Sequence, residues 1–168
     1  MTGTESPTVE LFVRSLSLKF DRSPADDHLD RLRDLADRGL VDLTVSVWGR
    51  EVGLSTTASR TDAGEYVLDR VATVRQWADR HGVSVAPFFQ ERRVESGLTG
   101  ETYATLVLPV TCLAEYRDGA LVHATPHVAD SSVHSVCDHL ERLAAIDDHD
   151  RPRSDSPVAI ELQPPIRQ

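Results

Sequence analysis

The sequence predicts an α+β fold: a ferredoxin-like βαββαβ core that is extended by a C-terminal β-hairpin and a third helix. Over residues 41–47, apolar residues alternate strictly with polar ones, which is typical of a half-buried strand. Two other segments carry apolar residues at helical spacing between residues that cap helices. Asp118-Gly119, between two apolar segments, favours a tight hairpin turn. The resulting order of strands and helices is that of the split βαβ motif.

The first predicted strand and helix lie before residue 40. Residues 9–14 are expected to form a strand that is buried on both faces, because apolar residues occupy both sides of its alternation. Ser23 is a good N-cap, Pro24 suits the first helical position, and Gly39 is expected to end the helix. We expect this helix and the second one to cover the same face of the sheet after right-handed crossovers.

The predicted core continues with a short strand, a long helix and a fourth strand. The short strand is expected over residues 51–57, and Thr61 is expected to cap a helix that Gly82 ends. Residues 83–89 are predicted as the last strand of the core. Because Pro87 has no backbone N–H to give to a ladder, we place this strand at an edge or expect it to bend.

The C-terminal half is expected to cover the open face of this sheet. Residues 91–100 are predicted as a polar loop, and residues 102–116 as a long apolar strand that Pro109 interrupts. After the hairpin turn the chain returns as a strand. Asp130 or Ser131 is then expected to cap the third helix.

We expect one folded domain, residues 8–146, between two flexible ends, since a chain of 168 residues suits a single domain. Residues 1–7 are predicted as a disordered leader that lacks the apolar region of a signal peptide. Residues 147–168 are predicted as a flexible acidic, proline-containing tail, in which 158–162 is the one candidate for a docked strand. No apolar segment approaches the length of a membrane span, so we expect a cytoplasmic protein without membrane contacts.

The charge composition indicates adaptation to very high salt. Lys19 is the only lysine among 18 basic residues, and 27 acidic residues give a net charge of -9. At about 1 M salt the Debye length is only ~3 Å, so these charges would scarcely repel one another. The alternative is an ordinary acidic protein from a GC-rich genome. In molar salt, net charge also loses its weight as an argument against DNA binding.

A metal site is one candidate, although only a weak one. The candidate ligands are Cys112, His123, His127, His134 and Cys137. If the hairpin pairs residue 112 with residue 125, the first three project from one face, and the last two lie on one side of the following helix. Zinc takes nitrogen and sulfur donors of this kind, but no close-spaced pair such as C-x₂-C occurs. We therefore expect no metal and no cofactor.

A nucleophilic thiol is the second candidate, and the sequence favours it less than core packing. Cys137 lies near the start of the predicted third helix with His134 one turn earlier. Val133, Val136 and Leu140 form an apolar stripe on this predicted helix, and the place of Cys137 in that stripe predicts that it points inward. Neither a phosphate-binding glycine loop nor a G-x-S-x-G motif occurs. We therefore expect a non-enzymatic protein, with a small metal- or thiol-dependent enzyme as the least favoured alternative.

Aromatic and basic residues form a third candidate, an interface. Its members are Trp48, Arg50, Phe88, Phe89, Arg92 and Arg93. Aromatic residues and arginines dominate the energetics of protein interfaces, so the set predicts a homodimer or another protein partner. The alternative is a strand end whose aromatic residues belong to the core and whose charges are solvated.

Four segments of the chain are similar to segments of a known protein family: VELFVRSLS (9–17), VSVWGREV (45–52), APFFQERRV (86–94) and TGETYATLVLPVTCLAEYRDG (99–119). Together they resemble a family of small, uncharacterised haloarchaeal proteins commonly labelled as helix-turn-helix (HTH) domain proteins. The resemblance covers about residues 8–145 and implies a role in transcriptional regulation. We therefore expect a cytoplasmic regulatory or interaction module of a halophilic archaeon, linked to transcription. A direct DNA-binding regulator is the alternative.

Overall fold

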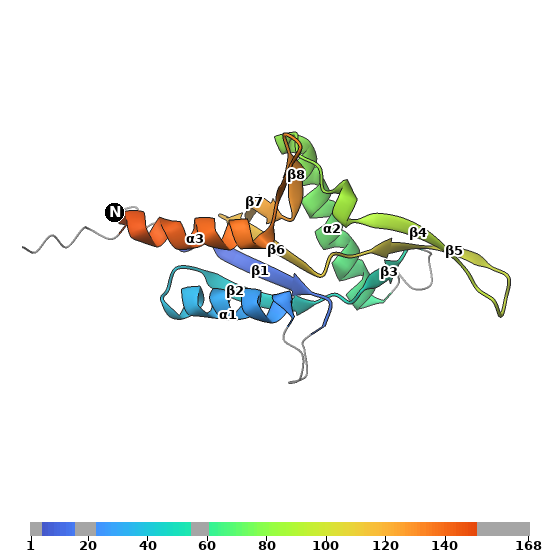
Figure 1. Ribbon diagram of the computed structural model, residues 1–168. Helices are drawn as coiled ribbons and strands as arrows, with labels where there is room; N and C mark the ends of the chain where they lie inside the picture. The colour runs from blue at the N-terminus through green and yellow to red at the C-terminus, as the bar shows by residue number, and fades with distance from the viewer. Residues whose placement is uncertain (1–4, 16–22, 55–60, 151–168) are drawn as a thin grey trace, which may run out of the picture.

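The computed structural model describes residues 5–15, 23–54 and 61–150, with side chains placed up to residue 146 (Figure 1). It confirms the α+β class. Lys19 and the candidate docked strand at 158–162 lie outside the described residues. The helices are α1 (Pro24–Asp37), α2 (Asp62–His81) and α3 (Val136–Asp150), with one 3-10 turn, η1 (Ala86–Phe88). The strands are β1 (Thr8–Val13), β2 (Asp42–Val47), β3 (Glu51–Gly53), β4 (Gln90–Glu95), β5 (Thr102–Val107), β6 (Thr111–Arg117), β7 (Ala120–Thr125), β8 (His127–Ala129) and β9 (Ser132–His134).

The strands form a main sheet and two smaller ones, and the ferredoxin-like topology is not confirmed. The main sheet has the order β2-β1-β6-β7, in which β1 and β2 are parallel neighbours and the other pairs are antiparallel. A split βαβ motif would instead place another strand between β1 and β2. The second sheet has the order β3-β5-β4, and β8 and β9 form a two-stranded sheet.

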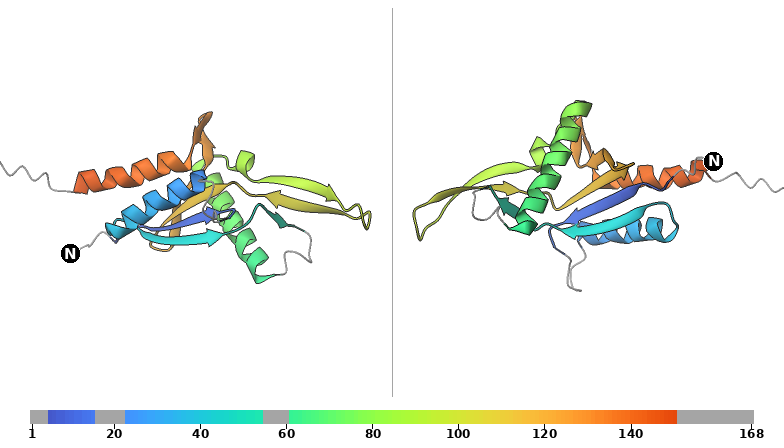
Figure 2. Two further views of the ribbon diagram at one scale, coloured as in Figure 1. Left: turned by 60° about the horizontal axis from the view of Figure 1, so that its bottom comes forward. Right: turned by 180° about the vertical axis from the view of Figure 1, so that it is seen from behind.

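The helices cover both faces of the main sheet, so the expectation that the first two share a face is wrong. Seen from behind, α2 crosses the face opposite to α1 (Figure 2). The cause lies in β1, which is apolar on both sides. Val9, Leu11 and Val13 pack with residues of α1 and α3, whereas Phe12 packs with residues of α2. Each face of β1 therefore needs a helix packed against it.

The caps of the first two helices form as predicted. Ser23 and Asp26 make a capping box at the start of α1, and the backbone N–H of Ser23 donates to Asp26 Oδ2 at 2.8 Å. At the start of α2, Thr61 Oγ1 accepts from the backbone N–H of Gly64 at 3.1 Å. Gly82 ends α2 in the left-handed conformation, with φ of 64°.

Residues 83–89, which were predicted as a strand, do not form a strand. Only Ser84 forms a bridge, to Val128, and Pro87 lies in the 3-10 turn, where its missing N–H is not needed. The strand follows instead as β4, where a polar loop was expected. Together β4 and β5 form a hairpin that projects from the body of the molecule (Figures 1 and 2). Because β4 is largely exposed, it lacks the apolar alternation that would have revealed it, whereas β5 is the first part of the strand predicted over residues 102–116.

The third helix begins later than predicted. Ser135 is its cap: the Ser135 N–H donates to Asp138 Oδ2 at 2.7 Å, and the Asp138 N–H donates to Ser135 Oγ at 3.2 Å. Asp130 and Ser131 instead form the turn between β8 and β9, with φ of 50° and 62°. His134 therefore lies on a strand, not one helical turn before Cys137. The helix continues to residue 150, into the segment predicted as tail.

The Asp118-Gly119 hairpin forms as predicted, but its register changes. Asp118 and Gly119 have φ of 51° and 76°, as a tight hairpin turn requires. A bulge between Glu115 and Tyr116 then shifts the pairing, so that His123 lies opposite Glu115 and residue 125 opposite Leu113. The predicted pairing of residue 112 with residue 125 is therefore wrong. Since a shift of one residue reverses the faces, the bulge places His123 and Cys112 on opposite sides of the sheet.

Candidate functional site

An open groove of about 470 Å³ lies where α1, η1 and the junction of β9 with α3 meet. Its lining includes Arg14, His28, Phe88, Leu108, Val110 and Val133. The lining is mainly apolar, and Val110 and Val133 are 47% and 60% exposed. Binding sites for small molecules are typically apolar clefts of roughly this size with a few polar groups. The groove therefore has the size and lining of a ligand site.

Cys137 and His28 meet at this groove, although 109 positions separate them in the sequence. His28 Nε2 lies 3.2 Å from Cys137 Sγ, and His28 Nδ1 lies 3.3 Å from Thr111 Oγ1. His28 is buried in the second turn of α1, whereas Cys137 is exposed. Burial, and then Arg31, lower the pKa of His28, so its ring is neutral at pH 7. A neutral ring can accept the thiol proton at Nε2 and donate from Nδ1 to Thr111.

A second polar cluster is buried beneath α3. Glu115, on β6, has a side chain that is only 3% exposed. Its carboxylate accepts from Arg142 at 2.7 Å, from His139 at 3.0 Å and from Arg117 at 3.2 Å. Thr125 Oγ1 lies 3.0 Å from the other ring nitrogen of His139. Burial alone would raise the pKa of Glu115, but the surrounding donors hold it at about 2. The carboxylate is therefore ionised and serves as the centre of a stable buried network.

A third cluster surrounds Glu10 on β1. Glu10 is 5% exposed and accepts from the hydroxyl groups of Tyr66 and Ser46, the latter at 2.9 Å. Arg70 Nε lies 3.8 Å from the same carboxylate, and the guanidinium stands over the rings of Tyr66 and Tyr116. Among the described residues Arg70 Nε has no hydrogen-bond partner, but Arg70 Nη1 donates to the Tyr116 hydroxyl at 3.2 Å. Since Tyr66 and Arg70 both belong to α2, the cluster fastens α2 to the main sheet.

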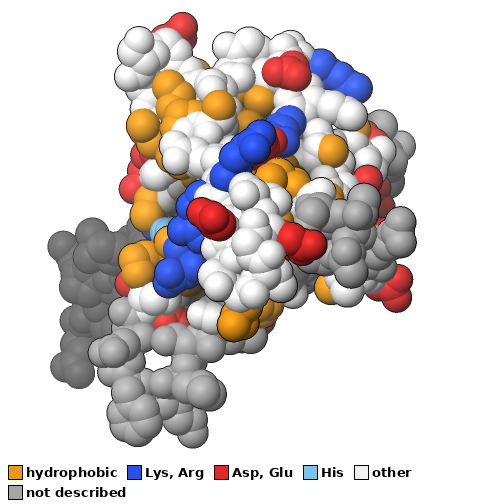
Figure 3. Space-filling model, turned by 90° about the vertical axis from the view of Figure 1, so that its right-hand side faces the viewer, with side chains coloured by type: hydrophobic (Ala, Val, Ile, Leu, Met, Phe, Trp, Pro, Cys, Tyr) orange, Lys and Arg blue, Asp and Glu red, His pale blue; other side chains and the backbone are white. Residues whose placement is uncertain are grey.

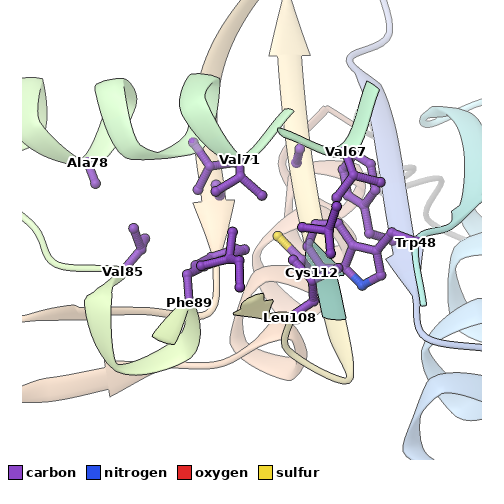
Figure 4. Packing of buried hydrophobic residues seen from close by; sticks show 14 of the residues in the cluster. Trp48, Val67, Val71, Ala78, Val85, Phe89, Leu108 and Cys112 are labelled. Atoms are coloured by element: carbon purple, nitrogen blue, oxygen red, sulfur yellow. The ribbon is translucent and has the colours of Figure 1, made fainter. Parts of the chain in front are cut away.

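The five predicted metal candidates do not form one set of ligands, although three of the histidines are neighbours. The rings of His123 and His127 lie 5.2 Å apart, and His127 stacks on His134 at 4.8 Å. Cys112 is not among them: it is buried in the core, and burial raises the pKa of its thiol to about 12 (Figure 4). Cys137 is exposed at the groove, so the prediction that it points inward is wrong. Within the part of the chain that the structure describes, no group of three or more such side chains could hold a metal ion.

The candidate interface residues separate into a buried set and an exposed set. Trp48 stacks on Phe12 at 4.6 Å between ring centroids and meets Phe89 edge to face at 5.9 Å. Trp48 and Phe89 are therefore core residues. Phe88 is half-buried and lines the groove. The remaining members are arginines 50, 92 and 93, which are exposed. Figure 3 views the end of the molecule that carries the β4–β5 hairpin and shows basic side chains in a row between apolar ones.

The sequence did not predict the partners of Cys137 at the groove, or the buried network around Glu115. His28 and Thr111 were not among the candidates, because nothing local links them to Cys137. Neither Glu115 nor His139 was singled out as a candidate. A usable signal did exist for the acids: Glu10 and Glu115 each interrupt an otherwise apolar strand, where a charge needs buried partners.

Comparison with known proteins places the chain in a family. No curated protein and no solved structure matches it. A family model described as "Helix-turn-helix domain" matches residues 1–148, which include nearly all of the described α+β domain. None of the described helices is long and apolar enough to cross a membrane. The chain therefore belongs to this helix-turn-helix domain family.

Proposed function

We propose that this chain is a non-enzymatic regulatory module of transcription that works as a homodimer, joined through the open edge of β4. Membership of a helix-turn-helix domain family supports the link to transcription. In the described residues, α1 is followed by a strand and α2 by the 3-10 turn, so neither begins a pair of consecutive α-helices. The observation that carries the proposal is the strand edge of the projecting hairpin.

The backbone groups of Glu91 and Arg93 point toward this open edge. β4 is the last strand in the order β3-β5-β4. At the hairpin tip the Ser96 N–H donates to the Glu101 carbonyl at 2.8 Å. Because bonded and non-bonded pairs alternate along an antiparallel ladder, Arg92 bonds to β5 and its two neighbours face away.

The other side of β5 agrees with this assignment. The Leu54 N–H donates to the Ala104 carbonyl at 2.9 Å, so the backbone of Ala104 faces residue 54. Ala104 is also the residue opposite Arg93. It therefore cannot use the same backbone groups to pair with Arg93, which leaves those of Arg93 open to another strand.

The side chains of β4 make this edge complementary to itself. If two copies pair in antiparallel fashion about Arg92, Glu91 lies opposite Arg93 of the partner subunit, and the reverse pair forms by symmetry. Opposite charges in directly facing positions stabilise paired strands. Each Arg92 already donates to Glu51 of its own chain at 2.9 Å, which reduces repulsion at the two-fold axis. Two three-stranded sheets then join into one.

Charge reversal at β4 tests the dimer. Arg93→Glu would place a carboxylate opposite the partner subunit's Glu91 in both pairs across the axis. The like charges repel each other, so this variant is expected to be monomeric. The double variant Glu91→Arg/Arg93→Glu restores both opposite-charge pairs and is expected to dimerise again. Arg80→Glu, on the exposed surface of α2, is the matched control and should behave as the wild type. Size-exclusion chromatography with light scattering in a KCl series measures all four.

A wild-type chain that stays monomeric at every concentration and salt level would refute the dimer. A dimer that Arg93→Glu leaves intact would refute its assignment to β4. The link to transcription is separate, and chromatin enrichment of the tagged protein over input would test it. No enrichment would end that part of the proposal.

Direct DNA binding is the second candidate, favoured by the shape of the β4–β5 hairpin. A two-stranded ribbon fits the major groove, and Arg92 and Arg93 project from this one. Fluorescence polarisation with a duplex DNA library would show binding that weakens when both arginines become Glu. Arg80→Glu again serves as control, and equal binding by all three proteins would exclude the hairpin as the contact.

We further propose that the protein works in the cytoplasm of a halophilic cell. Its net charge of -9 supports this, because crowded carboxylates repel one another less in concentrated salt. Both cysteines are free, as a reducing compartment favours. The midpoint of urea unfolding should rise between about 0.1 M and 2 M KCl. A midpoint that does not change would contradict the salt adaptation.

A further inference from the structure

We propose that Cys137 is a nucleophilic thiol, activated by His28, that organic hydroperoxides entering the adjoining groove oxidise to a sulfenic acid. The proposal goes beyond the regulatory function and does not depend on the dimer. It assigns the groove a class of ligand, a hydroperoxide with an apolar body.

The first step of the argument is the pairing of nucleophile, base and orienting group. His28 Nε2 lies within reach of the Cys137 thiol, at 3.2 Å, and Thr111 Oγ1 holds the opposite ring nitrogen at 3.3 Å. A base that is itself oriented by a third group is the general arrangement of an activated nucleophile. Since α1, β6 and α3 each supply one member, the main fold fixes this geometry.

The second step is the surroundings of the sulfur. Cys137 is the second residue of α3, and the N-terminal end of a helix favours negative charge on a nearby group. Its side chain is exposed at the groove, so reagents can reach it. Cys112 provides the contrast: its side chain is 1% exposed and lies deep in the core (Figure 4). The chain therefore holds one accessible thiol with a base and one inert thiol.

The third step is the groove, which selects the oxidant. Phe88, Val110 and Val133 offer an apolar wall beside the sulfur, suited to an organic substituent that hydrogen peroxide lacks. Arg14 lines the same groove, and its Nε donates to the Leu108 carbonyl at 3.0 Å, which fixes the guanidinium at the wall. Burial of apolar surface gives an organic hydroperoxide extra binding free energy.

The reaction balances with the hydroperoxide as oxidant. The Cys137 proton passes to His28 Nε2, and the thiolate attacks the terminal oxygen of ROOH. The S–O bond forms as the O–O bond breaks, and the leaving alkoxide takes the proton from His28 to become ROH. The sulfur loses two electrons and the peroxide gains them. The products are a sulfenic acid on Cys137 and one alcohol.

The test treats the full chain with cumene hydroperoxide or hydrogen peroxide, traps sulfenic acid with dimedone, and locates it by peptide mass spectrometry. We expect modification at Cys137 and none at Cys112, with cumene hydroperoxide reacting about 10-fold faster or more. His28→Gln should lower both rates by about 10-fold or more, because a positioned base contributes at least that much. His81→Gln, on α2, is the matched control and should leave both rates unchanged.

A second variant keeps the test decisive if His28→Gln fails to fold. Val133 is 60% exposed, so Val133→Asp should fold, and its charge should abolish the preference for cumene hydroperoxide. The proposal is overturned if Cys137 in the folded chain reacts no faster than in urea. It is also overturned if both peroxides react equally with the wild type, or if Val133→Asp keeps the preference.

Discussion

Replacing Glu115 by Gln should destabilise the domain by about 2–3 kcal/mol at pH 7. The variant keeps the shape of the side chain but removes the charge at the centre of the network beneath α3. Hydrogen bonds to charged groups contribute about 1.5–3 kcal/mol each. Arg142 and Arg117 are 50% and 37% exposed, so water replaces much of what they lose. His139 is fully buried and must keep a compatible tautomer, which accounts for most of the expected loss.

The pH dependence of stability gives an independent value for the free energy that the ionised Glu115 carboxylate contributes to folding. The pKa of Glu115 in the folded chain, about 2, lies below its ordinary value of 4.5. A lowered pKa means that the stabilisation is complete above about pH 4.5 and is lost as the pH falls toward 2. At about 1.4 kcal/mol per unit, the shift corresponds to about 3 kcal/mol. Glu115→Gln should therefore lose less stability than the wild type across this pH range.

Urea unfolding at fixed KCl, followed by circular dichroism at pH 7 and at pH 3, measures both effects. Glu101→Gln, at an exposed position near the hairpin tip, is the control and should change stability by less than about 0.5 kcal/mol. If Glu115→Gln behaves like this control at pH 7, the network does not stabilise the fold as the distances suggest. An unchanged pH profile would refute the low pKa.

Two further substitutions test the core and a helix cap. Trp48→Ala removes the ring that stacks on Phe12 and should cost about 3–5 kcal/mol in urea unfolding; a loss below about 1 kcal/mol would show that Trp48 is not a core residue. Ser135→Ala removes the cap that receives the Asp138 N–H and should cost about 1 kcal/mol, whereas Ser132→Ala, on exposed β9, should cost nothing measurable. Equal stability of the two serine variants would contradict the assigned start of α3.

The elements that the sequence predicts correctly are those that local chemistry decides. Ser23 and Thr61 are followed by helical spacing and then by glycines, so α1 and α2 could be placed from short segments alone. The Asp118-Gly119 turn is equally local. Tertiary contacts decide the rest: β1 and β2 become neighbours, and the bulge beside Glu115 changes which side chains share a face.

The candidate sites were harder to predict because their members are distant in sequence. Cys137 was considered as a nucleophile, but with His134, on the assumption that both lay on one helix. Because α3 begins only after His134, this histidine is not one helical turn before Cys137. The histidine that contacts Cys137 is His28, on the neighbouring helix α1. The β4 edge was hidden for a different reason: a solvated strand between Pro87 and a polar turn has the composition of a loop.

The most direct test of the dimer through β4 is a cross-link at its two-fold axis. In the register proposed, residue 92 forms a non-hydrogen-bonded pair with its own copy, where Cα atoms lie about 4.5 Å apart, within disulfide reach. Arg92→Cys in a Cys137→Ser background, mildly oxidised, should give a covalent dimer of twice the 18.6 kDa chain on a non-reducing gel. Arg80→Cys in the same background should stay monomeric. If the two variants cross-link to the same extent, β4 does not join the subunits.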